Sequence, residues 1–80
     1  MENVIEDKKL NMIKKLYPKG TRIKLIRMND DYPVPAGTKG IVDFIDSEGQ
    51  IQMKWDNGSS LALIYGVDEF EIIKNKERER

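Results

Sequence analysis

Hydrophobic and polar residues alternate in short runs over much of the chain. In the run 22–28, Ile23 and Leu25 fall on one side and Arg22 and Lys24 on the other; in the run 50–55, Ile51, Met53 and Trp55 fall on one side. A period of two is typical of a β-strand with one buried face. Runs of this kind, separated by turn-forming residues at close spacing, predict a mainly β domain.

Three more strands are predicted at residues 41–45, 59–64 and 70–73. In the first of these, Val42 and Ile45 are three positions apart, whereas strict alternation places inward residues two apart. We therefore expect a β-bulge or a strong bend within this strand.

The segments between the strands differ in length. Residues 29–39 contain two prolines, a glycine and two adjacent aspartates, which predicts a long loop. Short turns are predicted at residues 47–49 and 65–68. Asn57-Gly58 predicts a tight type I′ hairpin, because that turn requires positive φ at two positions.

A different periodicity precedes the strands. Within residues 2–16, Leu10, Ile13 and Leu16 share one face of a helix, and Pro18 ends the pattern. We expect an amphipathic helix that either packs on the β domain or is a frayed end of the chain. The alternative is a basic arm that contacts an acidic partner, since lysines dominate the polar face.

The predicted fold is a five-stranded SH3-like barrel behind an N-terminal helix. A short meander with this order of loops hides its edge strands by curling on itself. The expected organisation is a helical segment at residues 1–19, the barrel at 20–73 and a charged tail at 74–80. The tail has no apolar side chain, so we expect it to be disordered.

Composition narrows the chemistry. The 80 residues include no Cys and no His, which removes disulfides and the preferred ligands of zinc. No cofactor or metal is expected, and the absence of Cys and of a long apolar stretch predicts a cytoplasmic protein that does not enter the membrane. The chain is neutral overall, but residues 20–73 carry five basic and nine acidic side chains, a net −4. This balance disfavours nucleic acid as a general partner.

Catalysis is not expected. Nucleophilic catalysis in proteins usually relies on a base such as His, and the remaining candidates for acid–base work are aspartates. Asp30, Asp46 and Asp68 all fall in predicted loops or turns, where carboxylates commonly accept backbone N–H bonds. The sequence therefore predicts a non-enzymatic protein.

Several short strings carry a resemblance to a known family. They are Gly20-Thr21-Arg22-Ile23, Met28-Asn29-Asp30, Pro35-Ala36-Gly37-Thr38-Lys39-Gly40, Trp55-Asp56-Asn57-Gly58, Leu61 and Val67-Asp68-Glu69-Phe70. In these strings, residues 20–73 resemble a family of small bacterial domains of unknown function, common in phages and conjugative elements of Gram-positive bacteria. The resemblance implies the barrel fold and a mobile-element setting, and it leaves the helix and the tail outside.

Aromatic residues and prolines supply the candidate binding residues. Tyr32, Pro33 and Pro35 lie in the long loop, and loops on rigid scaffolds often carry binding sites. In SH3-like barrels aromatics floor a peptide groove, where we place Trp55 and Tyr65 together with Tyr32. The alternatives are that Trp55 belongs to the core, which we favour, and that Tyr32 and Pro33 cover the open end of the barrel.

Three hypotheses for function follow. The first is a protein-binding module with an unidentified partner, such as a mobile-element accessory factor acting on a host protein. The second is a nucleic-acid-binding barrel, in which a local basic stripe opposes the acidic total. The third is a structural unit that oligomerises through its helix; the oligomeric state itself is left open. The basic candidates for the second hypothesis are Arg22, Lys24, Arg27 and Lys54.

Overall fold

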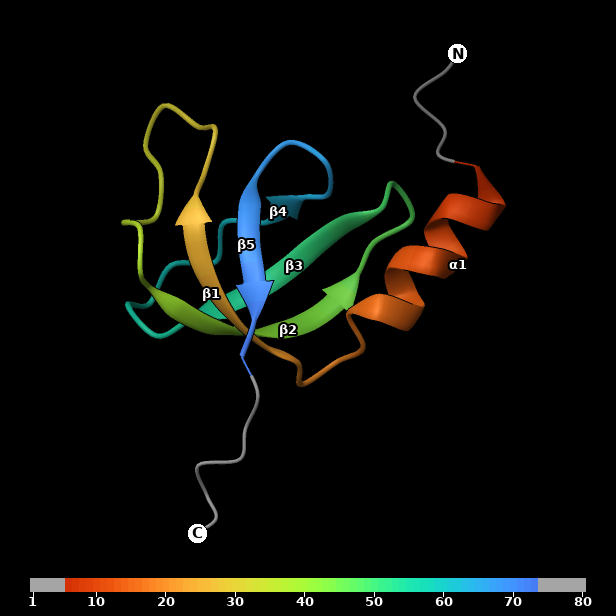
Figure 1. Ribbon diagram of the computed structural model, residues 1–80, viewed down its shortest axis with the longest axis horizontal. Coiled ribbons are helices and arrows are strands. Elements are labelled where there is room, and N and C mark those ends of the chain that lie inside the picture. Colours follow the sequence, from red (N-terminus) through yellow and green to blue (C-terminus); the bar gives the residue numbers. More distant parts are fainter. Residues whose placement is uncertain (1–5, 74–80) are drawn as a thin grey trace, which may run out of the picture.

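The computed structural model describes residues 6–73 as one short helix and a five-stranded sheet (Figure 1). The elements are α1 (Asp7–Leu16), β1 (Arg22–Arg27), β2 (Lys39–Ile45), β3 (Gln50–Trp55), β4 (Leu63–Ile64) and β5 (Glu69–Ile72). The mainly β class and the N-terminal helix are thus confirmed. The tail predicted to be disordered lies outside the described residues.

All strand pairs are antiparallel, and the strand order is β4-β3-β2-β1-β5. The chain meanders from β1 to β4, and β5 then returns to pair with the free side of β1. In Figure 1 β5 passes in front of β3, so the sheet curls over itself. The predicted five-stranded meander is confirmed, while the finer assignment as an SH3-like barrel stays a prediction.

The inner face of the curled sheet forms the core. Alternate residues of the strands are buried there, as the period of two requires. Trp55 is 4% exposed, and its indole N–H donates a 2.8 Å hydrogen bond to the Leu61 carbonyl, so its one polar atom is satisfied. The buried apolar side chains of the strands are Ile23, Leu25, Val42, Ile51, Met53, Trp55 and Leu63.

The predicted bulge in β2 is present. Val42 lies opposite Met53, whereas Phe44 lies opposite Gln52, which is the next residue of β3 in that direction. Asp43 is therefore the extra residue. Beyond the bulge Phe44 faces outward and is 53% exposed.

The hairpin after β3 closes where expected, but the type I′ prediction is wrong. Gly58 has φ +92°. Only glycines have positive φ in the described part of the chain, so Asn57 does not have the positive φ that a type I′ turn requires of both its central residues. The Gly58 N–H donates to the Trp55 carbonyl at 3.0 Å, and the Trp55 N–H donates to the Ser59 carbonyl at 3.0 Å. In this longer loop a single residue needs the left-handed conformation, and glycine adopts it without steric cost.

The strand predicted at residues 59–64 is reduced to the two residues of β4. The preceding segment uses its backbone groups locally. The Leu61 N–H donates to the Ser59 hydroxyl oxygen at 3.2 Å, and the Leu61 carbonyl accepts the Trp55 indole N–H. These bonds replace part of the ladder that a regular strand would form with β3.

Helix α1 is anchored to the sheet near its C-terminal end. Ile13 is 1% exposed and belongs to the core, and Tyr17, which follows the helix, packs against the core. This confirms the expectation that the helix packs on the β domain. No helix among residues 6–73 is long and apolar enough to cross a membrane.

Candidate functional site

The long loop between β1 and β2 exposes the residues proposed for binding. Tyr32 is 85% exposed, and Pro33 and Pro35 are also exposed. Tyr32 therefore does not cover the end of the domain, contrary to the alternative considered above. That role belongs to Val34, which is buried and donates its backbone N–H to the Met28 sulfur at 3.4 Å.

The predicted grouping of Tyr32, Trp55 and Tyr65 in one groove does not occur. Trp55 is a core residue, as favoured from the sequence, and is inaccessible to a ligand. Tyr65 instead belongs to an aromatic cluster with Tyr17 and Phe70. The centroid of the Tyr17 ring lies 6.1 Å from that of the Tyr65 ring and 5.4 Å from that of the Phe70 ring.

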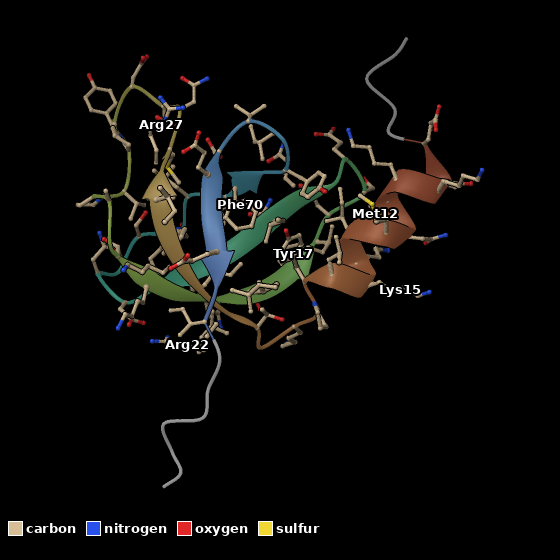
Figure 2. The ribbon with its side chains drawn as sticks, in the orientation of Figure 1. Met12, Lys15, Tyr17, Arg22, Arg27 and Phe70 are labelled. Atoms are coloured by element: carbon tan, nitrogen blue, oxygen red, sulfur yellow. The ribbon has the colours of Figure 1, made fainter. Side chains whose placement is uncertain are left out.

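This aromatic cluster floors a surface pocket of about 470 Å³ beside β5, here called the β5 groove. Figure 2 shows Tyr17 and Phe70 in the space between the end of α1 and β5. Apolar contact surface and mutual packing of the rings give the groove a defined floor. Its main lining residues are Tyr17, Ile26, Tyr65, Glu69, Phe70 and Glu71.

The groove is acidic at its rim. Glu69 and Glu71 line it; Glu69 is paired with Arg27 of β1 at 2.9 Å, and no lysine or arginine is itself among the lining residues. Burial raises the pKa of the Tyr17 hydroxyl, and the nearby Tyr65 raises it further. The Tyr17 hydroxyl therefore stays protonated at neutral pH, where it can donate a hydrogen bond to a ligand.

A buried carboxylate fixes the corner that carries Tyr65. Asp68 is 7% exposed; its two oxygens accept the backbone N–H groups of Asn29 and Ile64, each at 2.8 Å. The same side chain thus joins the end of β1 to the start of the corner. This confirms the capping role predicted for Asp68 and explains how the groove wall is held.

Three of the four basic candidates share the outer face of the sheet, because Arg22 and Lys54 both lie opposite Ile41 of β2 and Lys24 is two positions from Arg22 on β1. Arg22 and Arg27 lie at opposite ends of β1 (Figure 2), and each is paired with a carboxylate. The Arg22 guanidinium lies 3.3 Å from both Asp56 oxygens, and that of Arg27 lies 2.9 Å from Glu69. Lys54 is exposed on the outer face of β3.

The other aspartates considered for acid–base chemistry have structural partners. Asp30 accepts the Tyr32 N–H at 3.0 Å, and Asp46 accepts the backbone N–H groups of Glu48 and Gln50. Within residues 6–73, no group of three or more His, Cys, Asp or Glu side chains is placed to hold a metal ion.

Sequence reasoning missed Tyr17, Ile26 and Phe70 as groove residues. A signal for Tyr17 existed, because it follows the buried Ile13 by four positions and so continues the same helical face. For Ile26 there was none. It lies between Leu25 and Arg27, where the pairing of β1 with β5 shifts register, and such a shift is set by the partner strand.

Comparison with curated proteins and with solved structures finds no match. A family model does match, over residues 6–73, and this range includes α1. The expectation that the helix lies outside the family resemblance is therefore wrong, because Ile13 and Tyr17 are part of the packed domain. By this match over most of its length, the chain belongs to the family described as Domain of unknown function (DUF4314).

Proposed function

We propose that this protein is a small, non-enzymatic module that binds a partner protein in the β5 groove. The observation that carries the proposal is a shallow groove lined by the aromatic cluster of Tyr17, Tyr65 and Phe70 and by the carboxylates of Glu69 and Glu71. Binding sites are typically concave and mostly apolar, with a few polar groups that set orientation. Aromatic residues also supply much of the contact energy at protein interfaces.

The exposed loop extends this surface. Tyr32 is an aromatic side chain with 85% exposure in the loop between β1 and β2, in which Val34 is buried. In our proposal the groove is the main contact, and the Tyr32 loop is a second, separate contact for a larger partner. The cytoplasmic, mobile-element setting suggested by the sequence belongs to the same proposal.

A peptide-display library selected against the immobilised protein tests the proposal. Selected peptides should lose about tenfold or more in affinity for Ile26→Ser, since the substitution removes apolar contact area from the groove. Ile41→Ser is the matched control, because Ile41 lies on the outer face of β2 with 40% exposure, against 42% for Ile26. Affinity that depends on Ile41 and not on Ile26, or a library without enrichment, would show the proposal to be wrong.

Nucleic acid is disfavoured by the net charge of −4 that residues 20–73 carry. Arg22 and Arg27 are engaged by Asp56 and Glu69, which lowers the positive charge available to phosphates. We expect no submicromolar binding to mixed-sequence DNA or RNA at physiological ionic strength. Fluorescence anisotropy with labelled strands at two salt concentrations checks this. Tight, salt-sensitive binding abolished by Arg27→Glu and unaffected by Tyr32→Ala would contradict it.

Self-association through α1 is a second candidate, favoured by one observation. Met12 and Leu16 are 38% and 44% exposed and border a surface pocket of about 400 Å³. Figure 2 shows Met12 and Lys15 on α1. Light scattering over a range of protein concentrations should show a dimer that Leu16→Lys converts to a monomer. A monomer at all concentrations removes this candidate.

A further inference from the structure

β5 is the last strand of the sheet, and one of its sides has no strand partner among the described residues. The Ile73 N–H donates to the Arg22 carbonyl at 2.9 Å. Because backbone groups in an antiparallel pair alternate between the two sides of a strand, those of Phe70 and Ile72 point away from β1. Two N–H and two C=O groups are thus directed to the open side.

The side chains of β5 separate by character across the two faces of the strand. Phe70 lies opposite Leu25 on the inner face, where it also lines the groove, and Ile72 lies opposite Ile23. Glu71 lies opposite Lys24 on the outer face. Cross-strand neighbours share a face, so a strand added to β5 would meet apolar side chains on one face and carboxylates on the other.

We propose that the partner contributes an extended segment of alternating apolar and basic residues, which pairs with β5 as an additional strand. This proposal rests on the proposed function and names the class of ligand. The apolar residues of the segment lie over Phe70 and the groove floor, and its basic residues lie beside Glu71 on the outer face. Main-chain bonds supply affinity and the alternating side chains supply specificity, as in other cases of strand addition.

Charge complementarity selects this occupant over a second copy of β5. Glu69 and Glu71 alternate along the strand, so two β5 edges would bring like charges together. Charged residues on an edge strand oppose self-pairing in this way. A basic strand meets less repulsion: Lys24 and Arg27 of β1 lie opposite Glu71 and Glu69, so the new strand would lie beyond β5, two strand positions from these basic residues.

The test uses a short, capped peptide of alternating valine and lysine, with a valine–glutamate peptide as the charge control. Titration into the ¹⁵N-labelled full chain should shift the amide signals of Phe70 and Ile72 and slow their hydrogen exchange. Glu71→Lys should weaken binding by about fivefold or more, since it replaces an ion pair by a like-charge contact. Glu48→Lys is the matched control, because it changes the charge equally at an exposed turn away from β5.

Two N-methylated peptides test the main-chain pairing directly. Methylation at the valines blocks the N–H groups that an antiparallel strand presents to β5, and methylation at the lysines blocks those of a parallel strand. Loss of binding by one of the two peptides supports strand addition. Equal binding of both, or equal binding of the valine–glutamate peptide, overturns it.

The failure of this inference is distinguishable from failure of the proposed function. Library peptides that depend on Ile26, without protection of the Phe70 and Ile72 amides by any of them, would leave the groove as a binding site and refute strand addition. A library without Ile26-dependent peptides would refute both.

Discussion

Removal of the Asp68 carboxylate should lower the free energy of unfolding much more than removal of an exposed carboxylate that also accepts a backbone N–H. Asp68→Ala leaves the Asn29 and Ile64 N–H groups without their acceptor at a site where the carboxylate is 7% exposed. A hydrogen bond to a charged group contributes about 1.5–3 kcal/mol, and partial access of water to the two N–H groups reduces the sum. We expect a loss of about 2–4 kcal/mol in the free energy of unfolding.

Urea unfolding and thermal melting followed by circular dichroism measure this loss. For a domain of this size 1 kcal/mol corresponds to about 4–8 °C, so the melting temperature should fall by about 8–32 °C. The melting temperature of Asp68→Asn should lie between those of the parent and Asp68→Ala. The amide keeps one acceptor oxygen, but its NH₂ group faces the other backbone N–H, which then has no acceptor.

Asp30→Ala is the matched control. Asp30 also accepts one backbone N–H, that of Tyr32, but in an exposed loop. Removal of the Asp30 carboxylate should lower the free energy of unfolding by less than about 0.5 kcal/mol, as is usual for surface positions. If the two alanine variants differ by less than about 1 kcal/mol, burial is not what makes the Asp68 bonds strong, and our account of the corner is wrong.

Three further variants probe other features of the fold. Gly58→Val should destabilise the domain by about 1 kcal/mol or more in urea unfolding, because φ is +92° there; a parent-like midpoint would contradict the turn. Gly40→Ala should cost about 1–3 kcal/mol and change the near-ultraviolet signal of Trp55, since the added Cβ would lie 2.7 Å from that ring; an unchanged signal would refute the close contact. The raised pKa of Tyr17 means that the unfolded chain releases this proton first, so stability should fall as the pH rises above about 10. Tyr17→Phe should show a shallower fall, and equal slopes would remove Tyr17 as the cause.

The features that local pattern determines were predictable. Alternation located the core positions of β1 and β3, and the three-residue spacing of Val42 and Ile45 located the bulge. The turn type was not predictable, because an Asn-Gly pair suits both a two-residue loop and a three-residue loop. The choice depends on how Trp55 pairs with Ser59 across the hairpin.

The candidate site was less accessible to sequence reasoning. Tyr65 was identified as a binding candidate, but its neighbours were not, because Tyr17 comes from the helix and Phe70 from the last strand. Contacts between residues so far apart in sequence depend on the curl of the sheet and the docking of α1. Solvent exposure of Tyr32 likewise depended on which loop residue entered the core, and Val34 did so.

The extra residue in β2 has a consequence for how this strand can vary in length. Asp43 stands between Val42 and Phe44, and past this point β2 is paired with β3 alone. Deletion of Asp43 would leave Val42 inward, Phe44 outward and Ile45 inward, which is regular alternation. Loss of one residue at this point would therefore turn no side chain to the wrong face, whereas the same loss elsewhere in the sheet would turn every following side chain of that strand to the opposite face.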